Sequence, residues 1–106
     1  MTAYDLYGCK LALGEAKACL EELFGVRFES RDSTYQGGEY FRYGDASAEH
    51  FVLKKNIDPF DGEPAEMKFP DYPILLYVNA TIRSTELQDA IGRLQGDYRL
   101  LRHEDF

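Results

Sequence analysis

Hydrophobic and polar positions alternate with two different periods along this chain, and the two periods divide it into strands and helices. From residue 12 to residue 24, apolar residues recur three or four positions apart, which predicts an amphipathic helix that ends at Gly25. Residues 84–96 repeat this pattern and predict a second helix, with Ser84 or Thr85 as its N-terminal cap.

Other segments alternate with a period of two or are continuously apolar, as is typical of strands. These segments are residues 4–9, 26–31, 39–43, 50–56, 73–81 and 98–103. Residues 32–38 contain a Gly-Gly pair and predict the turn of a hairpin. Residues 74–78 are apolar on both faces, so we expect a central strand there.

The predicted order of elements is β-α-β-β-β-β-α-β within one domain that spans residues 1–106. Hairpin-linked strands and two amphipathic helices predict an α+β fold. We expect a two-layer sandwich in which a mostly antiparallel sheet of five or six strands carries both helices on one face. The second face of the sheet would be partly exposed and would display aromatic and polar side chains.

A long acidic loop, residues 57–72, separates the fourth and fifth predicted strands. It holds five carboxylates and one lysine, so it carries a net charge of −4. Loops of this length in compact domains are often functional. Aromatic residues are interleaved with the acids, a combination that is typical of protein interfaces.

Four interpretations of this loop compete. A calcium site needs ligands at fixed spacings around a central glycine, and the acids do not match that spacing. Paired catalytic carboxylates are conceivable, and a merely solvated loop is the plain alternative. We favour an anionic docking surface formed by the following residues: Asp58, Phe60, Asp61, Glu63, Glu66, Asp71 and Tyr72.

The hairpin of residues 28–43 is the second candidate surface, because polar, charged and aromatic residues are concentrated there. Tyrosine offers a large contact area and a hydroxyl group at low entropic cost. We expect Tyr35, Glu39 and Tyr40 to contact a partner. The alternative is that these rings form cross-strand pairs that stabilise the sheet.

Catalytic signatures are weak. His50 and His103 lie in different predicted strands, and neither has a sequence neighbour that suggests a triad or a metal pair. Cys9 and Cys19 match no zinc motif, and we expect them to pack as small apolar groups. We therefore expect no enzymatic activity, no metal and no cofactor.

The net charge of −7, from 19 acidic and 12 basic residues, narrows the choice of partner. It disfavours nucleic acid, whose affinity depends on lysine and arginine, and it disfavours anionic membranes. It favours rapid association with a cationic protein. With neither a signal-peptide pattern nor a long apolar run, we expect a cytoplasmic protein.

The run FESRDSTYQGGEYFRYG, followed by HFVLKKNID, an acidic loop with prolines, and YPILLYVNAT before a last helix, resembles small immunity proteins. These belong to bacterial polymorphic-toxin systems, including contact-dependent growth inhibition. The resemblance covers about residues 4–92 and lies in the pattern of strands and composition.

The resemblance implies a cytoplasmic protein that binds the C-terminal domain of a cognate toxin, in many systems a basic nuclease. It would neutralise the toxin by blocking its active site or by locking it inactive. The alternative functions are a small-molecule-binding or enzymatic α/β domain, or a docking subunit of a larger assembly. The sequence leaves the oligomeric state open.

Overall fold

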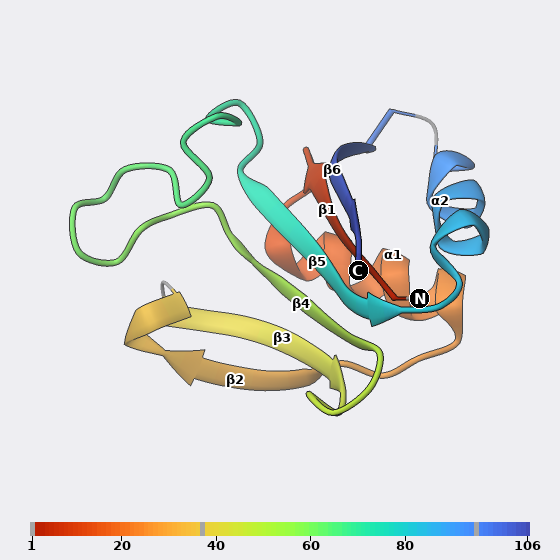
Figure 1. The fold of residues 1–106 in the computed structure, drawn as a ribbon. Coiled ribbons are helices and arrows are strands. Elements are labelled where there is room, and N and C mark those ends of the chain that lie inside the picture. Colours follow the sequence, from red (N-terminus) through yellow and green to blue (C-terminus); the bar gives the residue numbers. More distant parts are fainter. Residues whose placement is uncertain (1, 37, 95) are drawn as a thin grey trace.

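The computed structural model describes residues 2–36, 38–94 and 96–106, which form the predicted order of six strands and two helices (Figure 1). The elements are β1 (Ala3–Cys9), α1 (Leu13–Phe24), β2 (Glu29–Ser33), β3 (Gly38–Gly44), β4 (His50–Lys55), β5 (Ile74–Thr81), α2 (Ser84–Gly92) and β6 (Tyr98–Asp105). A short 3₁₀ helix, η1 (Thr34–Gln36), lies in the turn between β2 and β3.

The six strands form one sheet in the order β2-β3-β4-β5-β1-β6, and neighbouring strands are antiparallel. The predicted α+β fold with a mostly antiparallel sheet is therefore confirmed. β5 lies between β4 and β1, and both Leu75 and Leu76 are fully buried. The prediction of a central strand from its apolar run is also confirmed.

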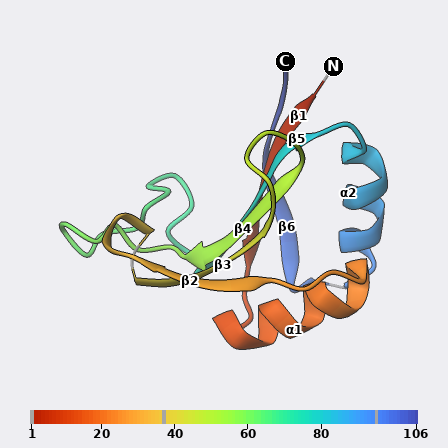
Figure 2. The same ribbon diagram turned by 90° about the horizontal axis from the view of Figure 1, so that it is seen from below.

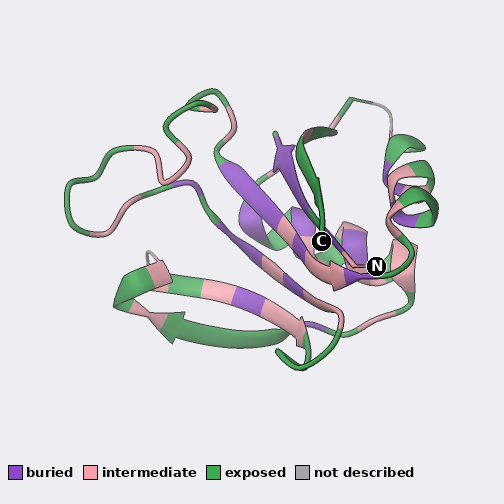
Figure 3. Ribbon diagram, viewed as in Figure 1, coloured by how far each residue is buried: buried purple, intermediate pink, exposed green. Residues whose placement is uncertain are grey.

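Both helices pack on the same face of the sheet (Figure 2). Leu20 of α1 and Leu87 of α2 belong to one hydrophobic cluster with Phe51, Val78 and Tyr98 from three strands. The outer faces of the helices and most of β2 remain exposed, whereas β1 and β5 are largely buried (Figure 3). Neither helix among the described residues is long and apolar enough to cross a membrane.

The helix-free face of the sheet is partly covered by residues of the acidic loop. Leu6 and Leu75 are buried but lie outside the helix-side cluster. The ring of Tyr72, at the end of the loop, lies directly over Gly8, two positions along β1 from Leu6. The loop is therefore part of the packing of the second face.

Several predicted boundaries differ from the structure. The second strand begins at Glu29 instead of residue 26, and the second helix ends at Gly92 instead of residue 96. Ser84 is the first residue of α2 and not its N-cap, because its hydroxyl group donates to Asp5. Residue 37, the first glycine of the predicted Gly-Gly pair, lies outside the described residues.

Candidate functional site

The base of the acidic loop is closed by the side chain of Asn56, which is only 7% exposed. Its Nδ2 donates to the backbone carbonyls of Phe69 and Tyr72, at 2.9 Å each. Its Oδ1 accepts the backbone N–H of Glu66, also at 2.9 Å. One amide thus binds three backbone groups of the loop, and the carbonyl of Phe69 also accepts the N–H of Tyr72 at 3.4 Å.

Glu66 ties the loop to the sheet through its carboxylate. Its Oε1 lies 2.9 Å from Arg102 Nη1, and its Oε2 accepts the hydroxyl of Tyr77 at 3.3 Å. The side chain is only 18% exposed. Burial, with the negative charge of Glu66, raises the pKa of Tyr77, so this phenol stays protonated. Glu66 was expected at the docking surface, but it makes intramolecular contacts.

Tyr72 is also engaged within the molecule. Its ring occupies the space above Gly8, where a side chain would overlap it. Lys10 Nζ lies 4.9 Å from the centroid of the same ring, within the range of a cation–π contact. The aromatic ring that ends the loop is therefore an anchor on the sheet.

The tip of the loop forms a compact series of turns that its own acids stabilise. Asp58 Oδ1 accepts the N–H of Phe60, and Asp61 Oδ1 accepts the N–H of Glu63, both at 2.9 Å. The backbone of Asp58 pairs with Glu63 and Gly62, at 2.7 Å and 2.9 Å. These bonds fix the backbone of the tip and the carboxylates of Asp58 and Asp61.

The tip meets the hairpin turn through two exposed rings. Tyr35 and Phe60 lie edge to face, with centroids 5.9 Å apart, and they are 78% and 74% exposed. The two segments meet because β3 and β4 are antiparallel neighbours, so the turn before β3 and the loop after β4 leave the sheet at the same end (Figure 1). The two segments that the sequence suggested separately thus meet at these two rings.

We call this the tip surface. It consists of Tyr35, Asp58, Phe60, Asp61 and Glu63. Of the other predicted docking residues, Asp71 is exposed at the loop base. Glu39 is exposed on β3 and accepts the Ser30 hydroxyl, and Tyr40 is half-buried on the same strand.

A second polar cluster, which the sequence did not suggest, joins β1, α2 and β6, and we call it the Asp5 cluster after its central residue. The carboxylate of Asp5 is fully buried and accepts the hydroxyl of Ser84 and the Nδ1–H of His103. The Nε2 of His103 lies 3.1 Å from Asp105. These hydrogen bonds, first that of Asp5 and then that of Asp105, raise the pKa of His103.

This cluster contains the residue types of a hydrolytic triad but not its connectivity. In a triad, the two ring nitrogens of the histidine bind the hydroxyl and the carboxylate separately. Here Nδ1 of His103 faces both Asp5 and, at 3.4 Å, the hydroxyl of Ser84, while Nε2 faces Asp105. The hydroxyl of Ser84 donates to Asp5, so the buried carboxylate joins the three elements. A signal for it did exist in the sequence, because Asp5 is a lone acid inside a largely apolar strand.

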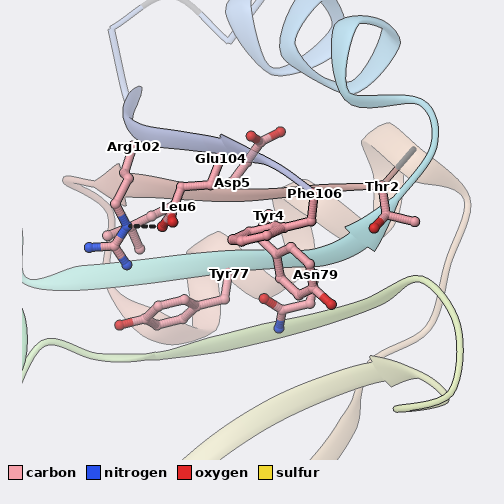
Figure 4. Close-up of a pocket in the computed structure, with 9 residues that line it drawn as sticks. All are labelled: Thr2, Tyr4, Asp5, Leu6, Tyr77, Asn79, Arg102, Glu104 and Phe106. Carbon is pink, nitrogen blue, oxygen red and sulfur yellow. Dashed lines mark ion pairs between the residues drawn. The ribbon is translucent and has the colours of Figure 1, made fainter.

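A groove of about 570 Å³ lies on the helix-free face over β1, β5 and β6 (Figure 4). The rings of Tyr4, Tyr77 and Phe106 line it together with Asn79. Tyr4 and Phe106 stack edge to face with centroids 5.3 Å apart. Its volume falls within the range of small-molecule sites.

Other site chemistry is sparse in the part of the chain that the structure describes. No group of three histidine, cysteine or acidic side chains there is placed to hold a metal ion. Cys9 and Cys19 are free thiols, and burial raises the pKa of Cys9. A buried thiol with a raised pKa is a poor nucleophile.

Comparison of the sequence with protein-family models and with curated proteins found no match. The tip surface, the groove and the Asp5 cluster are therefore the features that bear on the function of this protein.

Proposed function

We propose that this protein is an immunity-type inhibitor that binds a basic toxin domain in the cytoplasm and neutralises it through the tip surface. The observation that supports the proposal is the exposed pair of Tyr35 and Phe60, which stands among the carboxylates of the loop tip. A partner that covers these rings gains apolar burial, and the acids select a cationic partner.

The rings suit the centre of an interface. Tyrosine and other aromatic anchors dominate binding energy, because they bury a large area with few rotatable bonds. The backbone of Phe60 is fixed by its hydrogen bond to Asp58, and its ring contacts that of Tyr35. Less backbone freedom therefore has to be lost when a partner packs against it.

The charge of the tip favours a basic partner. Residues 57–65 contain three acids, Asp58, Asp61 and Glu63, and no lysine or arginine. The neighbouring acid Glu66 is paired with Arg102, so it adds little to the charge that the three tip acids present. Charges of this kind act mainly on the rate of association, and their effect becomes weaker as the salt concentration rises.

The test is co-expression with the variable C-terminal domain of a toxin encoded next to this protein. The wild-type protein should restore growth, and the purified pair should associate more slowly as salt is raised. Asp58→Asn, Asp61→Asn and Glu63→Gln combined should lower the association rate. A matched control changes three exposed helical acids, Glu22, Glu86 and Asp89, to their amides.

Two results would contradict the proposal. Growth that is not restored by the wild-type protein would reject the immunity function. Equal association rates for the tip and helix variants would show that net charge alone, and not the tip surface, guides the partner.

The groove supports a second candidate function, the binding of a small aromatic molecule. Three rings and the amide of Asn79 surround it, so a flat ligand could stack and form hydrogen bonds there. Titration of a panel of aromatic fragments, followed by NMR, should shift the signals of Asn79 and Tyr77. If none of the fragments shifts these signals at millimolar concentration, the groove is not a site of this kind.

A further inference from the structure

The acidic loop is held to the rest of the molecule at three points, although charged loops of this length are usually mobile. Asn56 closes its base, Glu66 binds β5 and β6, and Tyr72 packs on β1. All three contacts lie outside the tip, which leaves the tip surface free for a partner.

We propose that Asn56 and Glu66 are positioning residues, which hold the tip surface in its docking conformation before a partner arrives. The inference rests on the proposed function, in which the tip surface makes the contact. It assigns these two residues no contact with the partner.

The role of Asn56 follows from its place in the chain. Asn56 precedes the tip, whereas the three backbone groups that it binds belong to Glu66, Phe69 and Tyr72, which follow the tip. The backbone N–H of Asn56 also donates to Pro73 at 2.8 Å. The amide therefore joins the two ends of the loop and shortens the segment that can move.

The role of Glu66 is to fix the closed loop to the sheet. Arg102 on β6 and Tyr77 on β5 bind different oxygens of its carboxylate, so its position is set from two strands. Lys54 of β4 is also buried, and its burial lowers the pKa of its ammonium group. The negative charges of Glu66 and Asp58 act in the opposite direction and raise that pKa. Removal of the Glu66 carboxylate would remove the direct bonds of the loop to β5 and β6.

A positioning role for Asn56 predicts that its substitution changes the dissociation rate of the complex much more than the association rate. Asn56→Ala changes no charge, so electrostatic steering of the partner is retained. A tip that is no longer preformed must be ordered in the complex, which costs free energy and shortens the lifetime of the complex. The dissociation rate should therefore rise while the association rate changes little.

The first experiment needs no partner. Amide hydrogen exchange should be measured for Asp58, Phe60, Gly62 and Glu63, whose N–H groups form the bonds of the tip. In Asn56→Ala we expect exchange to accelerate roughly tenfold or more, which corresponds to the loss of one or two net hydrogen bonds. The NOE between the rings of Tyr35 and Phe60 should weaken.

Variants at Glu66 keep the test decisive if Asn56→Ala does not fold. Glu66→Ala should accelerate tip exchange, and Glu66→Gln, which retains an oxygen for Tyr77, should accelerate it less. Asp71→Asn is the matched control, because it removes the same charge from an exposed position of the same loop. Unchanged tip exchange in the Glu66 variants, or equal acceleration in Asp71→Asn, would overturn the assignment.

The second experiment uses the toxin domain encoded beside the protein. Asn56→Ala should raise the dissociation rate roughly tenfold by the same reasoning. If the wild-type protein does not bind that domain, the proposed function fails while the exchange result still stands. If the variant binds with unchanged kinetics although its tip exchanges faster, the positioning role is wrong.

Discussion

The ring of Tyr72 fills the space that a side chain at Gly8 would occupy. A Cβ atom at position 8 would overlap the ring and would lie 2.9 Å from Leu101 Cδ1. A glycine in β1 and an aromatic residue at the end of the acidic loop are thus complementary. The packing of the loop on the sheet depends on both.

The first prediction concerns this contact. Gly8→Ala should lower the free energy of unfolding by about 1–3 kcal/mol, because a buried overlap must be relieved by moving Tyr72. Gly14→Ala is the control, since its Cβ meets nothing within 4 Å and alanine favours the helix by about 1 kcal/mol. Chemical denaturation of both variants checks the prediction, and a Gly8→Ala protein as stable as the wild type would refute the overlap.

Two buried tyrosines should respond in opposite ways to loss of the hydroxyl group. In the part of the chain that the structure describes, the Tyr7 hydroxyl is buried without a hydrogen-bond partner, whereas Tyr98 donates to the carbonyl of Ala16. Tyr7→Phe should therefore raise the free energy of unfolding by about 1 kcal/mol, and Tyr98→Phe should lower it by a similar amount. Equal effects in urea denaturation would contradict the difference between the two sites.

The Asp5 cluster predicts a dependence of stability on pH. The pKa of His103 in the folded protein is raised above its ordinary value of 6.5 by Asp5 and Asp105. The stabilisation is therefore complete below about pH 6.5 and is lost as the pH rises through the folded-state pKa. The Tm difference between the wild type and His103→Gln should shrink between pH 6 and pH 9.

Asp105→Asn tests which carboxylate matters most to that histidine. The Asp5 carboxylate is buried, whereas that of Asp105 is 54% exposed, so Asp105→Asn should retain most of the pH dependence. If the Tm difference between the wild type and His103→Gln does not vary with pH, the His103–Asp5 pair does not form in solution.

The tip surface predicts a loss of affinity without a loss of stability. Tyr35→Ala and Phe60→Ala should each weaken toxin binding about 30-fold or more, the effect of removing a hot spot of about 2 kcal/mol. Their Tm should change little, because both rings are mostly exposed. Ile82→Ala is a control at an exposed apolar residue outside the tip surface, which is 84% exposed.

In a double-mutant cycle the two tip substitutions should be non-additive, because the rings contact each other. Fully additive losses would contradict a coupling between the two rings, and an equal loss in Ile82→Ala would indicate that the partner binds elsewhere.

The order of elements and the central strand were predictable because they depend on local periodicity. The apolar run before Val78 and the helical spacing of Leu20 follow from residues close together in the chain. The α2 boundary was less predictable, since Ser84 binds Asp5 on a distant strand instead of capping its own helix.

The site was predictable in composition but not in arrangement. The sequence indicated acids and rings in two segments, but the contact of Tyr35 with Phe60 depends on the register of β3 against β4. Likewise, nothing in the sequence distinguishes Glu66 from the other acids of the loop, because its partners Arg102 and Tyr77 are distant along the chain. Long-range pairing of strands determines which charges are neutralised, and a one-dimensional charge count contains no such information.

The separation of the loop into a clamped base and a projecting tip has a consequence for how the protein can evolve. Asn56, Glu66 and Tyr72 carry the packing of the loop, whereas among the described residues the tip bonds largely to itself and to Tyr35. Under the proposed function, substitutions at Tyr35 or Phe60, whose rings are mostly exposed, can therefore alter which partner is recognised at little cost to folding. A lineage that meets a changed partner can vary these two positions one at a time, and we expect each intermediate to remain folded.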